Sequence, residues 1–195
     1  PHSVNIALRG RIETWTGTMV PWDANAVVTG NTEEISEALH RLHRVGYQPD
    51  CVLFEDWKQA GLPIQQSGMV PPRQLQAQMQ TAESPIVLDV RLPSEWTALR
   101  IGTVVNLPLS NLPKNANKLS KSQDIVTVCN SAYRSSMAIG VLERLGFESV
   151  RTMEGGGEAW IAAGLPTVGS EASDAHGGTT QRDLRLAERI SAERL

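Results

Sequence analysis

The sequence predicts an α/β protein whose mostly parallel sheet carries helices on both faces. Two runs of β-branched residues, 86–90 and 125–129, have the composition of short buried strands. Helical patterns stand between the strands and after them, and strands that alternate with helices favour a parallel sheet covered on both sides. Ligands of such sheets bind beyond the carboxyl ends of the strands. The residues at those ends are therefore the candidates for a functional site.

In the second half of the chain, each expected strand or helix is predicted by its own residue pattern. Strand patterns occur at residues 86–90, 104–106, 125–129 and 149–153. Helical patterns occur at residues 72–80, 135–145 and 158–163. Proline is favoured in the first turn of a helix, so Pro72 marks a helix start. Gly146 follows a run of apolar residues at helical spacing, which predicts the end of that helix.

The chain repeats itself. Two pairs of segments match at an offset of 100 residues, 24–29 with 124–129 and 42–47 with 142–147. A third pair matches at an offset of 103, 57–63 with 160–166, and the extra residues fall at Gly155-Gly156-Gly157. An internal repeat of this kind predicts two related structural units.

The two expected units are unequal. The first, residues 1–66, begins without the opening strand and helix of the second, residues 67–169, and residues 170–195 are predicted to be a linker and a C-terminal helix. A unit that lacks a central strand exposes a sheet edge, which is a liability. We therefore expect that the chain comes from a longer parent, or that another segment supplies the missing strand.

Composition excludes several classes of function. The 195 residues are 41% hydrophobic and 20% charged, and 18 basic against 21 acidic residues give a net charge of −3. Nucleic-acid and anionic-membrane binding need clustered Lys and Arg, so neither partner is expected. No apolar run approaches the ~20 residues of a membrane-spanning helix. His40, His43 and Cys51 lack a fourth ligand for a metal ion, and we expect no metal and no cofactor.

The two cysteines have different settings. Two cysteines do not make a disulfide framework, and their use is typical of a reducing compartment, so a cytoplasmic location is expected. Cys51 opens a strand pattern with no loop and arginine after it, and it is predicted to be a buried core thiol. Cys129 ends a strand pattern instead, where a ligand site is expected.

The segment after Cys129 has the pattern of an anion-binding loop. A turn of small and polar residues leads from the strand into a helix that starts near Arg134; its members are Asn130, Ser131, Ala132, Tyr133 and Arg134. Loop amides beside the positive end of a helix bind anions. Together with the Arg134 cation they favour a nucleophilic thiolate at neutral pH. The alternative is that Cys129 is a buried thiol at a strand end without chemistry.

Residues of about 70–169 resemble the rhodanese domain, a sulfurtransferase module. The resemblance is carried by Leu88-Asp89-Val90-Arg91 before Glu95-Trp96, Asn106-Leu107-Pro108-Leu109, the 129–134 loop with Ser135, Leu145-Gly146-Phe147, Glu154-Gly155-Gly156 before Trp160, and Gly164-Leu165-Pro166. It implies that Cys129 is the persulfide-carrying nucleophile and that residues 130–134 form the active-site loop. It also implies that Asp89, Arg91 and Ser135 support the site.

The chain departs from the family in two places. Many members have Gly-His-Ile where this chain has Leu99-Arg100-Ile101, which affects the entry to the site. A glycine is common where Ala132 stands, and alanine tolerates a positive φ poorly.

The length of the loop selects the chemistry. Four residues separate Cys129 from Arg134, whereas related phosphatases and arsenate reductases have five and hold a larger oxyanion. The resemblance therefore implies transfer of sulfane sulfur from thiosulfate or a persulfide to a thiol or cyanide. The expected partners are a small sulfur donor and a thiol acceptor. The alternative is a non-enzymatic interaction or redox-sensing module.

The first unit lacks the catalytic residues. Thr29 and Glu34 stand where the second unit has Cys129 and Arg134, so we expect a degenerate, catalytically silent rhodanese-like unit. Its sequence also resembles the middle domain of proteins that join a metallo-β-lactamase-like domain to two rhodanese units, such as persulfide dioxygenases. That resemblance suggests a covalently linked metallo-β-lactamase-like domain in a longer parent, and a homodimer is the other assembly considered.

Overall fold

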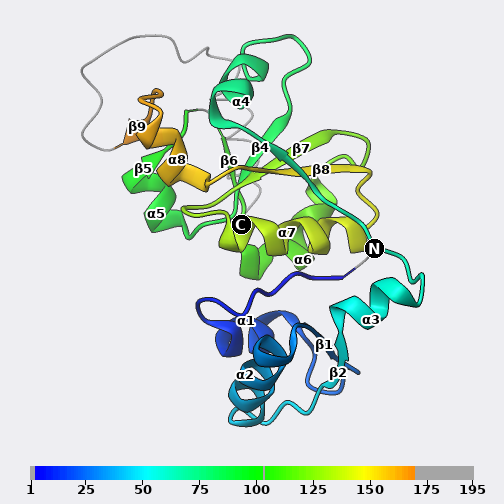
Figure 1. Cartoon of the computed structure of the whole chain (residues 1–195). Coiled ribbons are helices and arrows are strands. Elements are labelled where there is room, and N and C mark those ends of the chain that lie inside the picture. Colours follow the sequence, from blue (N-terminus) through cyan, green and yellow to red (C-terminus); the bar gives the residue numbers. More distant parts are fainter. Residues whose placement is uncertain (1–2, 103, 170–195) are drawn as a thin grey trace. The chain divides into compact units, whose positions relative to one another are not determined.

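The computed structural model describes residues 3–102 and 104–169, and it divides the chain into two compact units (Figure 1). The first unit is Asn5–Gln66, and the second contains Ser3 and Val4 together with the residues from Ser67 onward. The predicted linker and C-terminal helix at 170–195 lie outside the described residues. None of the described helices is long and apolar enough to cross a membrane. No group of three or more His, Cys, Asp or Glu in the described part of the chain could hold a metal ion.

The second unit is built on a five-stranded parallel sheet with the strand order β3-β8-β7-β4-β6. Its strands are β3 (Gly68–Val70), β4 (Ile86–Asp89), β6 (Val105–Asn106), β7 (Asp124–Val128) and β8 (Ser149–Met153). Every pairing in it is parallel, with Asp89 beside Val128 at the carboxyl ends of β4 and β7. The predicted α/β class with a mostly parallel sheet is confirmed. A separate antiparallel pair joins β5 (Leu99–Arg100) to β9 (Val168–Gly169).

Helices cover both faces of this sheet (Figure 1). They are α4 (Pro72–Gln78), α5 (Pro93–Ala98), α6 (Leu112–Asn115), α7 (Tyr133–Arg144) and α8 (Gly156–Ala162), with 3₁₀ turns at Leu109–Asn111 and Ala116–Lys118. Side chains alternate between the faces of a strand. On one face Val126 packs with Leu75 of α4 and Trp160 of α8, and on the other Thr127 bonds to the backbone of α7. This arrangement buries the middle strands on both sides, as their continuous apolar runs predict.

Helix α7 matches the sequence prediction closely at its end and differs slightly at its start. Gly146 adopts φ +86° and its amide donates to the Glu143 carbonyl, so the helix ends as predicted. The helix starts at Tyr133, one residue before the expected Arg134. The short helix α5 was not predicted, because its six residues are too few to show a periodic pattern.

The first unit has two strands and three helices. They are α1 (Ile12–Met19), β1 (Val27–Gly30), α2 (Thr32–His43), β2 (Asp50–Leu53) and α3 (Phe54–Gln59). Strands β1 and β2 pair in parallel, and a small core forms around Ile12, Ala38, Leu42 and Tyr47.

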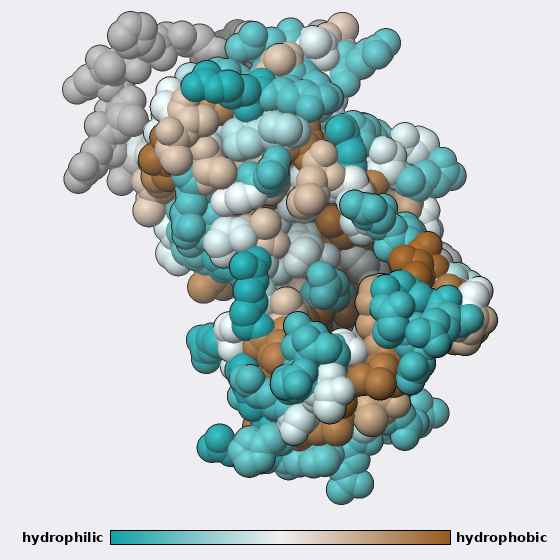
Figure 2. Space-filling model, viewed as in Figure 1, coloured by the Kyte–Doolittle hydropathy of each residue, from teal (hydrophilic) through white to brown (hydrophobic). Residues whose placement is uncertain are grey.

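Hydrophobic side chains reach the surface of the first unit (Figure 2). Among them are Val27, Leu53 and Phe54, with 58%, 37% and 42% of their surface exposed. The prediction that Cys51 is buried is wrong, because this thiol is exposed. Strand β2 belongs to a two-stranded sheet, which buries far less of its strands than the five-stranded sheet of the second unit does.

Candidate active site

Cys129 lies directly after β7, at the carboxyl edge of the sheet, and 1% of its surface is exposed. Its Sγ atom accepts a hydrogen bond from the Ser135 amide at 3.4 Å and lies 3.6 Å from the Ser135 hydroxyl. Helix α7 begins at Tyr133, so the Ser135 amide is one of the first-turn donors that have no partner within a helix. The positive end of α7 therefore faces the sulfur.

Ala132 makes the turn from the loop into α7. It adopts φ 64°, the left-handed conformation, and it is the one non-glycine residue with a positive φ in the described part of the chain. This conformation costs an alanine roughly 1–2 kcal/mol. The structure thus gives this position the backbone that a glycine would adopt without strain, as its departure from the family pattern indicated.

The glycine-rich start of α8 holds the loop from the other side. The amides of Gly157 and Glu158 donate to the carbonyls of Cys129 and Asn130, at 2.7 and 2.9 Å. A Cβ atom on Gly156 would lie 2.4 Å from the Asn130 oxygen and 2.5 Å from the Cys129 oxygen. Only a glycine allows this approach, because real Cβ contacts are longer. Sequence reasoning gave these glycines no role beyond a turn.

Arg134 forms a two-pronged ion pair with Glu95 of α5. Both N···O distances are 2.7 Å, and Glu95 also accepts from the Leu92 amide at 3.0 Å. The hydrogen bonds from Arg134 are the main cause that lowers the pKa of Glu95 to about 2. Glu95 in turn raises the pKa of Arg134, and the nearby Cys129 and Asp89 act in the same direction. Glu95 was not assigned to the site from the sequence.

Asp89 and Arg91 form a second ion pair at the end of β4. The Arg91 Nη2 atom lies 2.6 Å from Asp89 Oδ2, Asp89 is fully buried, and Arg91 is nearly so. Arg91 also donates to the Asn130 side-chain oxygen at 3.1 Å, and Asn130 lies 3.5 Å from Glu95. Of the two predicted supporting residues on this strand, Arg91 therefore reaches the loop directly and Asp89 holds Arg91, and Asn130 connects the two ion pairs.

The remaining predicted loop residues lie further out. Ser131 is exposed and Tyr133 is half-buried. Behind the sulfur, the Thr152 hydroxyl of β8 lies 2.7 Å from the Ser135 hydroxyl and 3.2 Å from the Thr127 carbonyl. Thr152 was not predicted to belong to the site, because a threonine in a strand pattern indicates only β structure. The site thus holds a cysteine at a helix N-terminus, in a loop fixed by two ion pairs and by α8.

Comparisons with known proteins identify the family of the second unit. The family model of the rhodanese-like domain matches residues 71–163. A protein of Allochromatium vinosum named "Sulfurtransferase" is 31% identical over 97 residues, which cover 50% of this chain and 91% of that protein. "Thiosulfate sulfurtransferase 16, chloroplastic" of Arabidopsis thaliana is 34% identical over 92 residues, 41% of this chain and 77% of that protein.

A solved structure supports the same fold. The solution structure of the rhodanese-like domain of an Anabaena protein has a TM-score of 0.50 at 29% identity, and it covers 58% of this chain and 88% of that domain. An uncharacterized Synechocystis protein is 36% identical over 99 residues, but the match spans only 55% of its length. The chain belongs to the rhodanese-like family. Relatives named sulfurtransferases support a sulfurtransferase family, although another relative is named a putative sulfur carrier protein.

Proposed function

We propose that the second unit is a sulfurtransferase that carries sulfane sulfur on Cys129 as a persulfide. The observation that carries this proposal is the contact of Cys129 Sγ with a first-turn amide of α7, at the start of a loop that reaches Arg134 after four residues. A helix N-terminus stabilises an anionic sulfur. The names of the Allochromatium and Arabidopsis relatives support the reaction class, and the latter name supports thiosulfate as donor.

The proposed reaction has two steps and no net change of oxidation state. The Cys129 thiolate attacks the outer sulfur of thiosulfate, or of a persulfide donor. The old S–S bond breaks, its electron pair leaves with sulfite or with the donor thiolate, and a new S–S bond forms on Cys129. Cyanide or an acceptor thiolate then attacks the outer sulfur, which leaves as thiocyanate or as a new persulfide. The bonding pair returns to Cys129, and the reaction needs no cofactor.

The residues around Cys129 have distinct proposed roles. The loop amides of residues 130–134 hold the outer sulfur, and the Ser135 amide and hydroxyl face Sγ. Asp89 and Arg91 fix the Asn130 side chain and thus the start of the loop. Because Glu95 pairs with Arg134, the guanidinium fixes the end of the loop.

Mass spectrometry tests the proposal directly. Treatment with thiosulfate or a persulfide should add one sulfur atom, about 32 Da, to the chain. The adduct should form in the Cys51→Ser variant and should be absent from the Cys129→Ser variant, and thiocyanate production should follow the same pattern. If both single variants accept sulfur equally, or if neither does, the proposed mechanism is wrong.

The burial of Cys129 favours a second candidate function. A thiol with 1% of its surface exposed is also what a non-enzymatic interaction module would contain, because buried structural thiols are inert. Such a module would give no sulfur adduct at Cys129 and no thiocyanate. The redox-sensing form of this alternative would in addition show reversible oxidation of Cys129 under mild oxidants, which requires that the thiol become accessible to solvent. Mass spectra and thiocyanate assays of the same variants therefore distinguish the two functions.

We further propose that the first unit is a degenerate rhodanese-like unit. Hydrogen bonds at the end of the long helix repeat at the offset of 100 residues. Tyr47 N donates to Leu42 O at 3.1 Å, and Phe147 N donates to Leu142 O at 3.1 Å. The glycines that end these helices adopt φ values of +87° and +86°.

A second repeated contact supports this relationship. The Trp57 indole donates to the Pro63 carbonyl at 3.1 Å, and the Trp160 indole donates to the Pro166 carbonyl at 2.8 Å. These pairs stand at the offset of 103 residues that the sequence repeat shows. The same local structure thus closes both units after α3 and α8.

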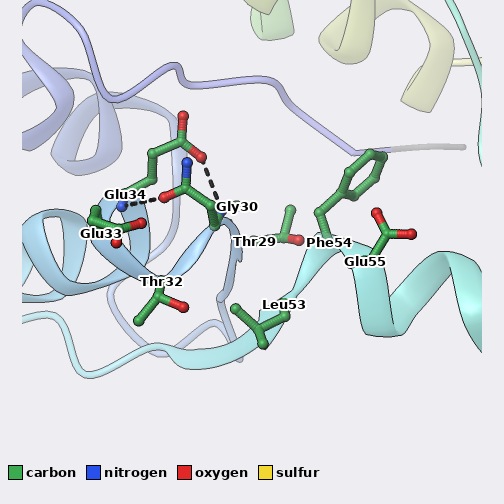
Figure 3. Close-up of a pocket in the computed structure, with 9 residues that line it drawn as sticks. Thr29, Gly30, Thr32, Glu33, Glu34, Leu53, Phe54 and Glu55 are labelled. Carbon is green, nitrogen blue, oxygen red and sulfur yellow. Dashed lines mark hydrogen bonds between the residues drawn. The ribbon is translucent and has the colours of Figure 1, made fainter.

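The position in the first unit that corresponds to the active site of the second carries a glutamate where the second unit has an arginine. Thr29, at the end of β1, and Glu34, in α2, line a cavity of about 630 Å³ together with Phe54 and Glu55 (Figure 3). Glu34 accepts from the Asn31 amide at 2.9 Å, while its own amide donates to Asn31 Oδ1. Because Thr29 and Glu34 stand where the second unit has its thiol and its arginine, this unit is catalytically silent in our proposal.

A linked metallo-β-lactamase-like domain, a homodimer and a cytoplasmic location stay predictions.

A further inference from the structure

A chain of three hydroxyl or thiol groups runs from the site into the core of the second unit. Cys129 Sγ lies 3.6 Å from Ser135 Oγ, which lies 2.7 Å from Thr152 Oγ1, which lies 3.2 Å from the carbonyl oxygen of Thr127. Ser135 is fully buried and Thr152 has 4% of its surface exposed. Buried hydroxyl groups need hydrogen-bond partners from the protein, so these groups must satisfy one another.

Thr152 has one hydroxyl proton and two acceptors within reach. Its Oγ1 is placed to donate either to the Thr127 carbonyl or to the Ser135 hydroxyl, but not to both at once. The Ser135 hydroxyl likewise has one proton, and it faces both Thr152 and Cys129. The heavy atoms place Thr152 as the donor to Ser135 and leave open only which of its two acceptors the Thr152 hydroxyl serves.

We propose that Thr152 is a positioning residue for the Cys129 thiolate, because its hydroxyl turns from the Thr127 carbonyl to Ser135 when Cys129 loses its proton. In the thiol state, S–H donates to Ser135 and Thr152 donates to the Thr127 carbonyl. When the thiol proton leaves to solvent, Thr152 donates to Ser135 instead, and the Ser135 hydroxyl proton turns to the anionic sulfur. This proposal rests on the proposed role of Cys129 as a nucleophile.

This change of acceptor by the Thr152 hydroxyl stabilises the thiolate more than the thiol. In the thiolate state the Thr152–Ser135 bond polarises the bond from Ser135 to a charged acceptor, and bonds to charged groups are the stronger ones. In the thiol state the Thr152 hydroxyl makes only a neutral bond, to the Thr127 carbonyl. Removal of the Thr152 hydroxyl therefore costs the thiolate more, and the thiol should need a higher pH to ionise.

The charged groups around the Cys129 loop lie on three elements, and the test does not change them. They are Arg134 of α7, the Asp89–Arg91 pair at the end of β4, and Glu95 of α5. From the α8 side the loop receives backbone amides, those of Gly157 and Glu158. A change confined to Thr152 leaves each of these contacts in place.

Thiolate absorbance in the ultraviolet, titrated with pH, tests the proposal in the Cys51→Ser background, where Cys129 is the one remaining cysteine. A variant that also carries Cys129→Ser serves as the blank. Thr152→Val, which replaces the hydroxyl by a methyl group, should raise the titration midpoint by about half a pH unit, the effect of roughly one neutral hydrogen bond. Thr152→Ser should restore the parent midpoint.

Thr127→Val is the matched control. The Thr127 side chain is equally buried, and its hydroxyl bonds to the carbonyls of Ser135 and Arg151, not to the Ser135 hydroxyl. Replacement of threonine by valine at position 127 should lower the free energy of unfolding without changing the pH midpoint of the Cys129 titration. Equal shifts in Thr152→Val and Thr127→Val, no shift in either, or no rescue by Thr152→Ser would each overturn the proposal. If the Val variant does not fold, Thr152→Ala replaces it with the same expectation.

Kinetics separate this proposal from the proposed function. Below the midpoint, turnover of thiosulfate and cyanide by Thr152→Val should fall about threefold, the same half pH unit expressed as thiolate population. At a pH well above the midpoint the turnover should equal that of the parent, with KM for thiosulfate unchanged throughout. A parent protein that forms no persulfide would refute the proposed function, while the midpoints of the variants would still decide the role of Thr152.

Discussion

Replacement of Glu95 by glutamine should lower the stability of the second unit in a way that depends on pH. Glu95 holds Arg134 through two contacts of 2.7 Å and has a pKa of about 2, compared with the ordinary value of 4.5. That difference corresponds to about 3 kcal/mol at ~1.4 kcal/mol per pH unit. Because 20% and 28% of the two side chains remain exposed, solvent screening reduces the expected loss to about 1–2 kcal/mol.

The sign of the pH dependence follows from the lowered pKa. A carboxylate with a lowered pKa stabilises the folded state fully above its unfolded pKa, and this stabilisation is lost as the pH falls from 4.5 towards 2. The difference between the wild type and Glu95→Gln should therefore be largest at neutral pH. It should shrink as the pH falls through this range, because the wild-type side chain then becomes neutral as well.

Urea unfolding followed through backbone resonances of α7 measures this difference within one unit of the chain. Titrations at about pH 7 and about pH 3 are compared for the wild type, Glu95→Gln and the control Glu148→Gln. Glu148 is an exposed carboxylate of the same unit, and its replacement should change little at either pH. A loss in Glu95→Gln that is the same at both pH values would refute the electrostatic reasoning.

Two backbone predictions have controls in the same unit. Ala132→Gly should raise the free energy of unfolding by about 0.5–1 kcal/mol and keep activity, because it relieves the positive φ. The control Ala77→Gly, at an exposed position of helix α4, should lower the free energy of unfolding by about as much. If urea unfolding shows that Ala132→Gly is destabilised, Ala132 is not strained. Gly156→Ala should abolish persulfide formation and cost about 2–4 kcal/mol, because it adds a clash with the loop carbonyls to a strained φ. Gly164→Ala has a similar φ of +67° and no atom near its Cβ, so it should cost only about 1–2 kcal/mol; equal losses would show that the close approach is unimportant.

The sequence predicts those parts of the structure that depend on neighbouring residues. Strand β7, the loop after it and helix α7 follow one another in the chain, so apolar runs, helical spacing and Gly146 were enough to place Cys129 at the edge of a parallel sheet. The position of Ala132 could also be questioned from the sequence, because the requirement for a positive φ is local.

Contacts between distant segments could not be predicted in the same way. Glu95 meets Arg134 across 39 residues, and Thr152 meets Ser135 across 17. A glutamate in the first turn of a short helix and a threonine in a strand have ordinary local explanations. The exposure of Cys51 depends on how many strands flank β2, which its own sequence does not encode.

The α8 turn has a consequence for the donors around the sulfur. A peptide unit is a rigid plane whose C=O and N–H point in opposite directions. Since α8 amides bind the carbonyls of Cys129 and Asn130, the N–H groups of Asn130 and Ser131 must point away from that helix. The start of α8 thus sets the direction of two loop amides through the carbonyls of the same peptide planes.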